Sequence, residues 1–290
     1  MHIELATLSP GTRIQFLEIP KQEVLETSFL KAIFFGRVSK VKRIPIDSYT
    51  EIENRLNYYP YQSRLQQDIV GEYKIKEQVF WLGTDKYGRD LLSRMLRGIR
   101  ISLSVGFIAV FISLVIGITL GLIAGYFRGR TDDIIMWFVN VIWSIPTLLM
   151  VIAITLALGK GFWQVFVAVG LTMWVEVARI VRGQVMAIRE LEYVEAGKAL
   201  AYKSKRIIFK HILPNVIGPV IVISAANFAA AILIEAGLSF LGIGAQPPMP
   251  SWGGMIKDHY AYIIMDKAYL AIIPGLAIMS LVLAFMLLGN

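Results

Sequence analysis

The sequence predicts an all-α polytopic membrane protein, and three observations predict this class. Hydrophobic residues make up 56% of the 290 residues and charged residues only 17%, with a mean hydropathy of +0.60. A soluble chain of this length carries about a quarter charged residues. Long apolar runs also alternate with short basic intervals, which is the charge pattern of a chain that crosses a membrane repeatedly.

Composition excludes several kinds of site. The chain contains no Cys, so disulfides, thiolate metal sites and cysteine nucleophiles are excluded. His2, His211 and His259 are too scattered to predict a metal centre. The sequence has no Gly-x-x-x-x-Gly-Lys-Ser/Thr motif for ATP, so we expect no enzyme activity and no cofactor. The net charge is +8, and the basic residues lie between apolar runs. This distribution indicates a lipid bilayer rather than a nucleic acid as the partner.

Residues 1–80 differ from the rest of the chain. They contain no run near the roughly 20 apolar residues that cross a bilayer, and no signal peptide. Alternation at residues 13–16 and 42–46 predicts short strands. Tyr58, Tyr59 and Tyr61 are interpreted as loosely packed aromatics of a small, β-rich segment. We therefore divide the chain into this segment at 1–80 and a membrane domain at 81–290.

Five apolar runs follow and predict five membrane spans, because each is long enough to cross at a rise of about 1.5 Å per residue. They cover residues 101–127, 134–159, 161–181, 212–234 and 268–290. Gly117, Gly121 and Gly125 recur every fourth residue, which predicts close packing against another helix. Glu176 and Arg179 lie three residues apart and predict an ion pair on one helix face, with Arg182 one turn further on.

The distribution of Lys and Arg predicts the orientation of the spans. The loop with Arg128 and Arg130, and residues 182–210, are expected in the cytoplasm, and residues 242–267 outside. Alternation then places residues 1–80 outside. Arg94, Arg97 and Arg100 oppose this placement, but segments longer than about 60 residues count weakly in the rule.

Residues 195–215, here called the basic segment, organise the second half of the chain. Small helix-favouring residues come first, Tyr202-Lys203-Ser204 predicts a turn, and a second short helix is expected through residues 207–209. Pro214 is expected to open the next helix. The charges keep the basic segment in water. A basic loop that only marks the cytoplasmic side is one interpretation, but an Ala/Gly face favours close approach of another backbone.

The basic segment resembles the EAA loop of binding-protein-dependent ABC importer permeases, which reads Glu-Ala-Ala, then Gly, then Leu-Pro. The matching positions are Glu195, Ala196, Gly197, Ala201, Leu213 and Pro214. Gly197 stands where the second Ala is usual, and Ala201 where the Gly is usual. The resemblance implies that this loop is the cytoplasmic coupling helix, which sits in a cleft of the ATPase subunit.

A second motif, residues 83–90 or the signature loop, precedes the first apolar run. Its beginning predicts a turn and Asp90 predicts a helix cap, so an entry turn at the membrane surface is as favoured as a functional site. With the preceding Leu, the pattern Leu-Gly-Thr-Asp-x-x-Gly-Arg-Asp resembles the external signature of the C-type permease subunit of dipeptide, oligopeptide and nickel importers. Its residues are Gly83, Thr84, Asp85, Gly88, Arg89 and Asp90.

Glu235, which directly follows the apolar run at 212–234, is the remaining charged candidate for chemistry in the membrane. A carboxylate at mid-bilayer costs about 2.5–3.5 kcal/mol, so it must face protein or water. It is either an interfacial residue at the outer end of its helix or part of the translocation path. The surrounding motif resembles the external re-entrant region near the pore of the same family, which gives as gate or pore candidates Glu235, Gly237, Ser239, Gln246, Pro247 and Trp252.

The resemblance implies a type I ABC importer permease bundle in the bacterial inner membrane that takes up peptides by alternating access. The implied partners are a second, B-type permease subunit, two ATP-binding subunits and an extracytoplasmic substrate-binding protein. Family members carry a further helix before the external segment and a polar tail, so we expect additional sequence at both ends. Alternatives are a permease for nickel or another small solute, or an ATPase-independent carrier or channel with broken helices. A sensory protein is less favoured because it requires an output domain.

Overall fold

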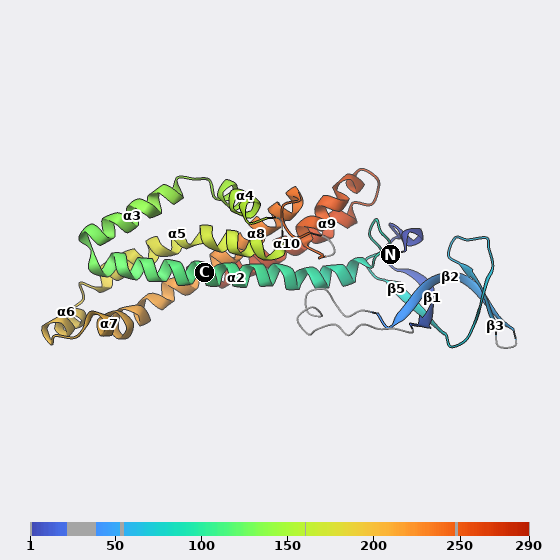
Figure 1. Cartoon of the computed structure of the whole chain (residues 1–290), viewed down its shortest axis with the longest axis horizontal. Coiled ribbons are helices and arrows are strands. Elements are labelled where there is room, and N and C mark those ends of the chain that lie inside the picture. Colours follow the sequence, from blue (N-terminus) through green and yellow to red (C-terminus); the bar gives the residue numbers. More distant parts are fainter. Residues whose placement is uncertain (1, 22–38, 53–54, 160, 247–248, 290) are drawn as a thin grey trace. The chain divides into compact units, whose positions relative to one another are not determined.

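A computed structural model describes residues 2–21, 39–52, 55–159, 161–246 and 249–289 (Figure 1). The chain packs as two compact units. The first contains residues 1–101, 247–250 and 258–273, and the second contains residues 102–246, 251–257 and 274–290.

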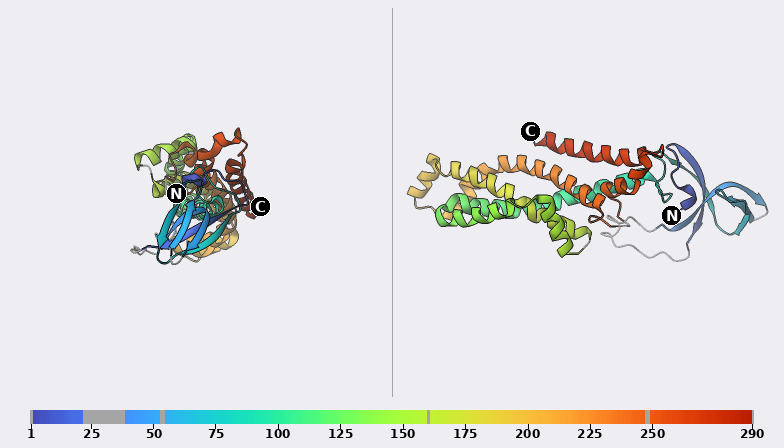
Figure 2. Two further views of the ribbon diagram at one scale, coloured as in Figure 1. Left: turned by 90° about the vertical axis from the view of Figure 1, so that its right-hand side faces the viewer. Right: turned by 90° about the horizontal axis from the view of Figure 1, so that it is seen from above.

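The first unit is built on an antiparallel sheet (Figures 1 and 2). The sheet has five strands in the order β4-β3-β2-β1-β5. The strands are β1 (Thr12–Pro20), β2 (Val41–Ile52), β3 (Arg55–Pro60), β4 (Gln67–Val70) and β5 (Lys74–Phe80). Strand β1 is central, with Gln15 opposite both Ile46 of β2 and Glu77 of β5. The predicted strands at 13–16 and 42–46 are confirmed.

Both faces of the sheet carry buried side chains, because successive side chains of a strand point to opposite faces. Ile14 and Phe16 pack on one face with Leu5 of the short helix η1 (Ile3–Leu5), and Leu17 packs on the other. Tyr58 is buried beside Leu17, and its hydroxyl donates to Gln67 Oε1 at 2.8 Å. The expectation of loose packing was therefore wrong for Tyr58.

The helices supply four candidate membrane spans among the described residues, or five if the bent pair α3–α4 is one span. The helical elements are α2 (Leu91–Phe127), α3 (Gly129–Trp143), α4 (Thr147–Ala157), α5 (Phe162–Ile188), α6 (Glu192–Ala199), α7 (Ser204–Ile207), the π-helical turn η2 (Ile208–Ile212), α8 (Leu213–Leu241), α9 (Trp252–His259), η3 (Tyr260–Ile263) and α10 (Tyr269–Leu288). The all-α membrane class with a small sheet is confirmed.

The second predicted span is not one straight helix. Helices α3 and α4 meet at an angle of 89°, with Ser144, Ile145 and Pro146 between them. Proline has no N–H to donate, and its ring clashes with the preceding helical turn, so Pro146 ends α3. The predicted span over 134–159 therefore corresponds to a bent pair of helices, because apolar character continues through the break although the helix does not.

Helix α2 begins ten residues before the apolar run at 101–127. Asp90 precedes it, and its Oδ2 accepts the Ser93 N–H at 3.1 Å, as the predicted N-cap requires. Arg94, Arg97 and Arg100 lie on the first three turns of α2, before the uncharged stretch.

The glycine stripe of α2 packs against α5, as predicted. A Cβ added at Gly121 would lie 2.7 Å from both the Ala178 carbonyl oxygen and Val181 Cβ. Gly117 and Gly125 approach Val177 and Val185 equally closely. The three glycines therefore let two backbones approach further than side chains would allow, which is how helices associate in lipid.

Candidate functional site

The basic segment folds as the predicted helix–turn–helix in the second unit (Figure 1). Helix α6 ends at Ala199, a turn covers residues 200–203, and α7 begins at Ser204. From Ser204 the chain runs through η2 into α8 as one apolar helical stretch to Leu241. Pro214 sits in the first turn of α8, as predicted, although α8 follows η2 without a break. The wider π turn immediately before Pro214 falls where proline cannot donate a hydrogen bond.

The turn between α6 and α7 is closed by two backbone hydrogen bonds. The Tyr202 N–H donates to the Gly197 carbonyl at 3.0 Å, and the Ala201 N–H donates to the Lys198 carbonyl at 2.9 Å. Ala201 itself has φ of 56°, in the left-handed region. This is the Schellman arrangement that usually carries glycine at the left-handed position. Ala201 thus takes the left-handed position of this turn, although a Cβ is costly there.

Buried residues anchor the basic segment to the helix bundle. Val194 of α6 and Ile207 of α7 are almost fully buried, in one cluster with side chains of α2, α5 and α8. Gly197 is also buried, and an added Cβ would lie 3.5 Å from Tyr202, in ordinary contact. Leu213 is half-buried against the same cluster. The basic segment therefore packs directly against the membrane helices α2, α5 and α8.

The opposite side of the basic segment is exposed. Glu195 and Ala196 face outward, as do Ala201 and Pro214. Larger apolar side chains accompany them, with Leu200 65% and Phe209 61% exposed. The same surface carries the charged residues Glu192, Lys198, Lys203, Lys205, Arg206 and Lys210. An anchored helix pair with small, apolar and charged residues on its free side has the composition of a docking surface.

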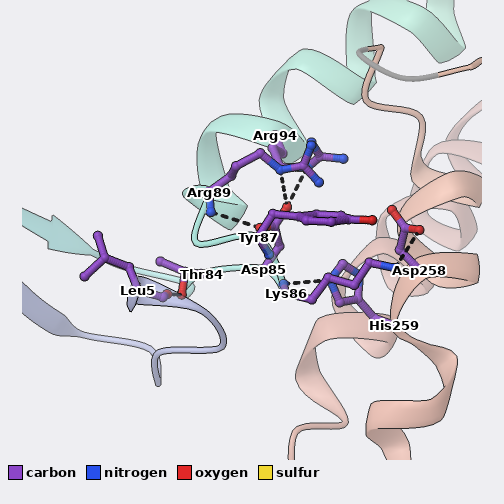
Figure 3. Close-up of polar contacts among 9 residues, drawn as sticks. All are labelled: Leu5, Thr84, Asp85, Lys86, Tyr87, Arg89, Arg94, Asp258 and His259. Atoms are coloured by element: carbon purple, nitrogen blue, oxygen red, sulfur yellow. Dashed lines mark hydrogen bonds and ion pairs between the residues drawn. The ribbon is translucent and has the colours of Figure 1, made fainter. Parts of the chain in front are cut away.

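The signature loop is organised by the carboxylate of Asp85, which is fully buried (Figure 3). Its Oδ1 accepts the backbone N–H groups of Tyr87 and Arg89 at 2.8 and 2.9 Å. Its Oδ2 accepts Arg89 Nε at 2.6 Å and lies 3.4 Å from Arg94 Nε. One carboxylate therefore holds both the turn and the first helical turn of α2.

Other residues of the signature loop tie it to chain segments far away in sequence. The Thr84 hydroxyl donates to the Leu5 carbonyl and accepts the Leu8 N–H. Lys86 Nζ contacts Asp258 Oδ1 at 3.0 Å (Figure 3). Burial lowers the pKa of Lys86, but the hydrogen bonds and charge attraction of Asp258 and Tyr87 together outweigh burial and raise the pKa above its ordinary value. The signature loop therefore connects the N-terminal residues to Asp258 within the first unit.

The two glycines of the signature loop are needed by this packing. Gly83 and Gly88 have φ of 73° and 69°, in the left-handed region. An added Cβ would overlap the carbonyl oxygen of Leu8 at Gly83 and that of His2 at Gly88. The close packing at Gly83 and Gly88 and the hydrogen bonds of Asp85 therefore explain the residues of the signature loop by their structural roles.

The gate candidates lie in or just after α8. Glu235 is buried, its Oε1 accepts the Ser239 hydroxyl at 2.7 Å, and Ser239 Oγ also accepts the Ala245 N–H at 3.1 Å. Trp252 at the start of α9 is buried, whereas Gln246 is exposed and donates to the Gly242 carbonyl. An added Cβ at Gly237 meets open space, and Pro247 lies outside the described residues. Ser239 therefore contacts both Glu235, one turn earlier in α8, and the backbone of Ala245 just after the helix.

The ion pair predicted between Glu176 and Arg179 is not formed. The Arg179 guanidinium donates to Asn140 Oδ1 and stacks 3.8 Å above the Trp143 ring, so α3 holds it. Arg182 forms a two-pronged ion pair with Asp132, also on α3. Sequence reasoning missed Asp132 because its partner lies 50 residues away.

The helical part of the chain has the architecture of a transmembrane ABC transporter subunit. The fold matches the MetNI methionine ABC transporter in an inward-facing conformation with a TM-score of 0.50 at 18% identity, covering 67% of this chain and 97% of that one. It matches an amino acid ABC transporter with histidines with a TM-score of 0.50 at 19% identity, covering 68% and 92%. At these identities the likeness shows the fold alone.

The particular family follows from the sequence comparison. Residues 117–290 match the model of the binding-protein-dependent transport system inner membrane component, and the chain belongs to this family. It is a multi-pass component of the bacterial inner membrane, as its apolar helices require. The resemblance read from the motifs is thereby confirmed.

Three relatives illustrate the similarity. The glutathione transport system permease protein GsiD of Pectobacterium atrosepticum is 41% identical over 210 residues, which cover 72% of this chain and 69% of that protein. The dipeptide transport system permease protein DppC of Alkalihalophilus pseudofirmus is 42% identical over 210 residues, with the same two shares. The oligopeptide transport system permease protein OppC of Bacillus subtilis is 43% identical over 178 residues, covering 61% and 58%.

Proposed function

We propose that this chain is a pore-forming permease subunit of an importer that moves peptides across the inner membrane. The relatives that support the substrate class are permeases of glutathione, dipeptide and oligopeptide transport systems. The observation that carries the mechanism is the basic segment, which is anchored through Val194 and Ile207 and exposed at Glu195 and Ala196. ATP is hydrolysed by separate subunits that dock on this exposed side.

The anchoring of the basic segment suggests how ATP hydrolysis moves the pore. Closure of two ATP-binding subunits displaces α6, and Val194 transmits the displacement to the buried cluster shared by α2, α5 and α8. Side chains in a packed cluster move together because close packing leaves them little room to move separately. The helices rotate as a unit, and the pore alternates between inward and outward access.

The other partners complete this scheme. A second permease subunit supplies the other half of the pore, and an extracytoplasmic binding protein delivers the peptide. We place residues 1–80 on that outer side. The region from Glu235 to Trp252 forms the outer closure of the pore, supported by the buried Glu235–Ser239 contact at the end of α8.

Charge reversal on the basic segment tests the docking proposal. If α6 is only solvated, Glu195→Lys loses a helix-dipole interaction of about 0.3–1 kcal/mol, and transport persists. If α6 docks a partner, breaking a buried charge contact costs about 2–5 kcal/mol. We expect Glu195→Lys and Ala196→Asp to insert normally, to lose the ATP-binding subunit on purification and to lose peptide uptake.

Asp68→Lys is the matched control, because it reverses an exposed charge on β4, outside the basic segment. It should retain both the ATP-binding subunit and uptake. Normal uptake with full retention of the ATP-binding subunit in Glu195→Lys and Ala196→Asp would remove the docking assignment.

A further inference from the structure

A cleft in the second unit lies beside the break between α3 and α4. Its volume is about 210 Å³, room for several waters of about 30 Å³ each. Helices α3, α4, α5 and α8 all contribute to it. The lining residues are Ile142, Trp143, Ile145, Thr147, Met150, Thr172, Met173, Val175, Glu176, Ala230 and Ile234.

Glu176 is the acidic residue among these lining residues, and it lies within the predicted span 161–181, five residues before its cytoplasmic end. Helix α5 runs from Phe162 to Ile188, so at 1.5 Å per residue Glu176 is about 21 Å from one end and about 18 Å from the other. A carboxylate at that depth does not face lipid, since it must be paired or reach water. It is exposed at the cleft.

No cation of the described residues neutralises Glu176, since none of their ion pairs includes it. Arg179 is the nearest basic residue along α5, but Asn140 and the Trp143 ring hold its guanidinium. The broken backbone at Ser144–Pro146 is also tolerated at membrane depth only where it is buried in protein or lines a water-filled cavity. The charge and the break both indicate a wet cleft that attracts a cation.

We propose that Glu176 receives the terminal ammonium group of the peptide as it crosses the membrane. This inference rests on the proposed function and names the group that the cleft recognises. Met150, Met173 and Ile234 give the cleft a mostly apolar wall, which accepts different side chains, while the carboxylate reads a group that every unmodified peptide carries. Helix α5 continues to Ile188, and only three residues separate it from α6, so the same helix links this site to the basic segment.

The test compares Glu176→Gln and Glu176→Asp with the unmodified chain in the intact complex, reconstituted in vesicles. The probes are a dipeptide with a free amino terminus and the same dipeptide acetylated there, each supplied preloaded on the binding protein at saturating concentration. The control is Asp133→Asn, which removes an exposed charge at the start of α3 outside the cleft.

We expect Glu176→Gln to lower the saturating uptake rate of the free dipeptide about tenfold, which corresponds to about 1.4 kcal/mol. Uptake of the acetylated dipeptide should not change, so the preference for the free amino terminus disappears. Glu176→Asp should keep most of the preference, and Asp133→Asn should keep all of it. The half-saturating concentration of loaded binding protein should stay the same, because the defect lies after docking.

Two results would overturn the inference. One is an unchanged preference in Glu176→Gln. The other is an equal loss for both dipeptides with less of the second permease subunit in the purified complex, which would show that Glu176 pairs with that subunit. Failure of the unmodified complex to transport either dipeptide is a different result, because it contradicts the proposed function itself.

Discussion

Substituting Ala201 by glycine should stabilise the turn between α6 and α7. Ala201 is exposed and has φ of 56°, so its Cβ makes no buried contact and occupies an unfavourable backbone region. The left-handed conformation costs an L-residue about 1–2 kcal/mol. Glycine escapes this cost but loses about 0.5–1 kcal/mol more in conformational entropy on folding. The net expectation is a gain of about 0.5–1 kcal/mol.

Hydrogen exchange measures this gain locally, without unfolding the membrane helices. The reporters are the Ala201 and Tyr202 amides, which donate to Lys198 and Gly197 when the turn is closed. A gain of about 0.5–1 kcal/mol lowers the open population by a factor of about 2–5, because 1.4 kcal/mol is a factor of ten. Exchange at residue 201, Gly in the variant, and at Tyr202 should slow by this factor in Ala201→Gly.

Ala199→Gly is the matched control. Ala199 is the last residue of α6 and has a helical conformation, so glycine there costs up to about 1 kcal/mol and should speed exchange. Opposite shifts in the two variants support the conformational account of the turn. Faster exchange in Ala201→Gly would refute it, since the Cβ of Ala201 would then be making a favourable contact.

Three further predictions concern the rest of the chain. A single Cys at Lys203 should be labelled only from the cytoplasm and one at Gln246 only from outside; labelling of both from one side would contradict the proposed orientation. Gly121→Leu should lower complex yield and thermal stability, because overpacking costs about 1–3 kcal/mol or more. The control Gly183→Ala places its Cβ in open space and should lower neither. Equal yields of the two variants would argue against close α2–α5 packing. Asp85→Asn should destabilise the first unit by about 3–5 kcal/mol, measured by protease sensitivity of the sheet, whereas Glu77→Gln, in an exposed pair with Arg13, should cost under about 1 kcal/mol; similar sensitivities would contradict the role of Asp85.

Much of the fold was predictable because local patterns determine it. The apolar runs predicted the membrane helices, alternation predicted parts of β1 and β2, and Asp90 predicted the N-cap of α2. The spacing of Gly117, Gly121 and Gly125 predicted a packing face, although only the structure identifies α5 as its partner. In each case the physical cause lies within a few residues of the signal.

Most of the failures have a different cause, which is competition between partners distant in sequence. Glu176 and Arg179 have the spacing of an ion pair, yet Arg179 finds Asn140 and Trp143 on another helix. The break between α3 and α4 was signalled by Pro146, but an uninterrupted apolar run conceals a bend. The contacts of Lys86 with Asp258 and of Thr84 with Leu5 carry no sequence signal.

The candidate site divides in the same way. The motif of the basic segment located α6 and α7, but the departure at Ala201 made the turn less expected, whereas the structure forms it with a left-handed alanine. Which residues anchor the segment and which stay exposed depends on packing with α2 and α5, and this was not readable from the sequence. The roles of Glu195 and of the residues around Glu235 stay predictions.

The central claim is that this chain forms part of a peptide import pore, and uptake by the intact complex tests it most directly. Cells lacking the chain, with all its partners present, should fail to accumulate a labelled dipeptide, and returning the chain should restore accumulation. Restored uptake should depend on ATP and on the binding protein, and unlabelled dipeptide should compete. Accumulation of nickel but not of dipeptide on return of the chain would contradict the peptide assignment. Uptake that persists without ATP would contradict the coupled mechanism.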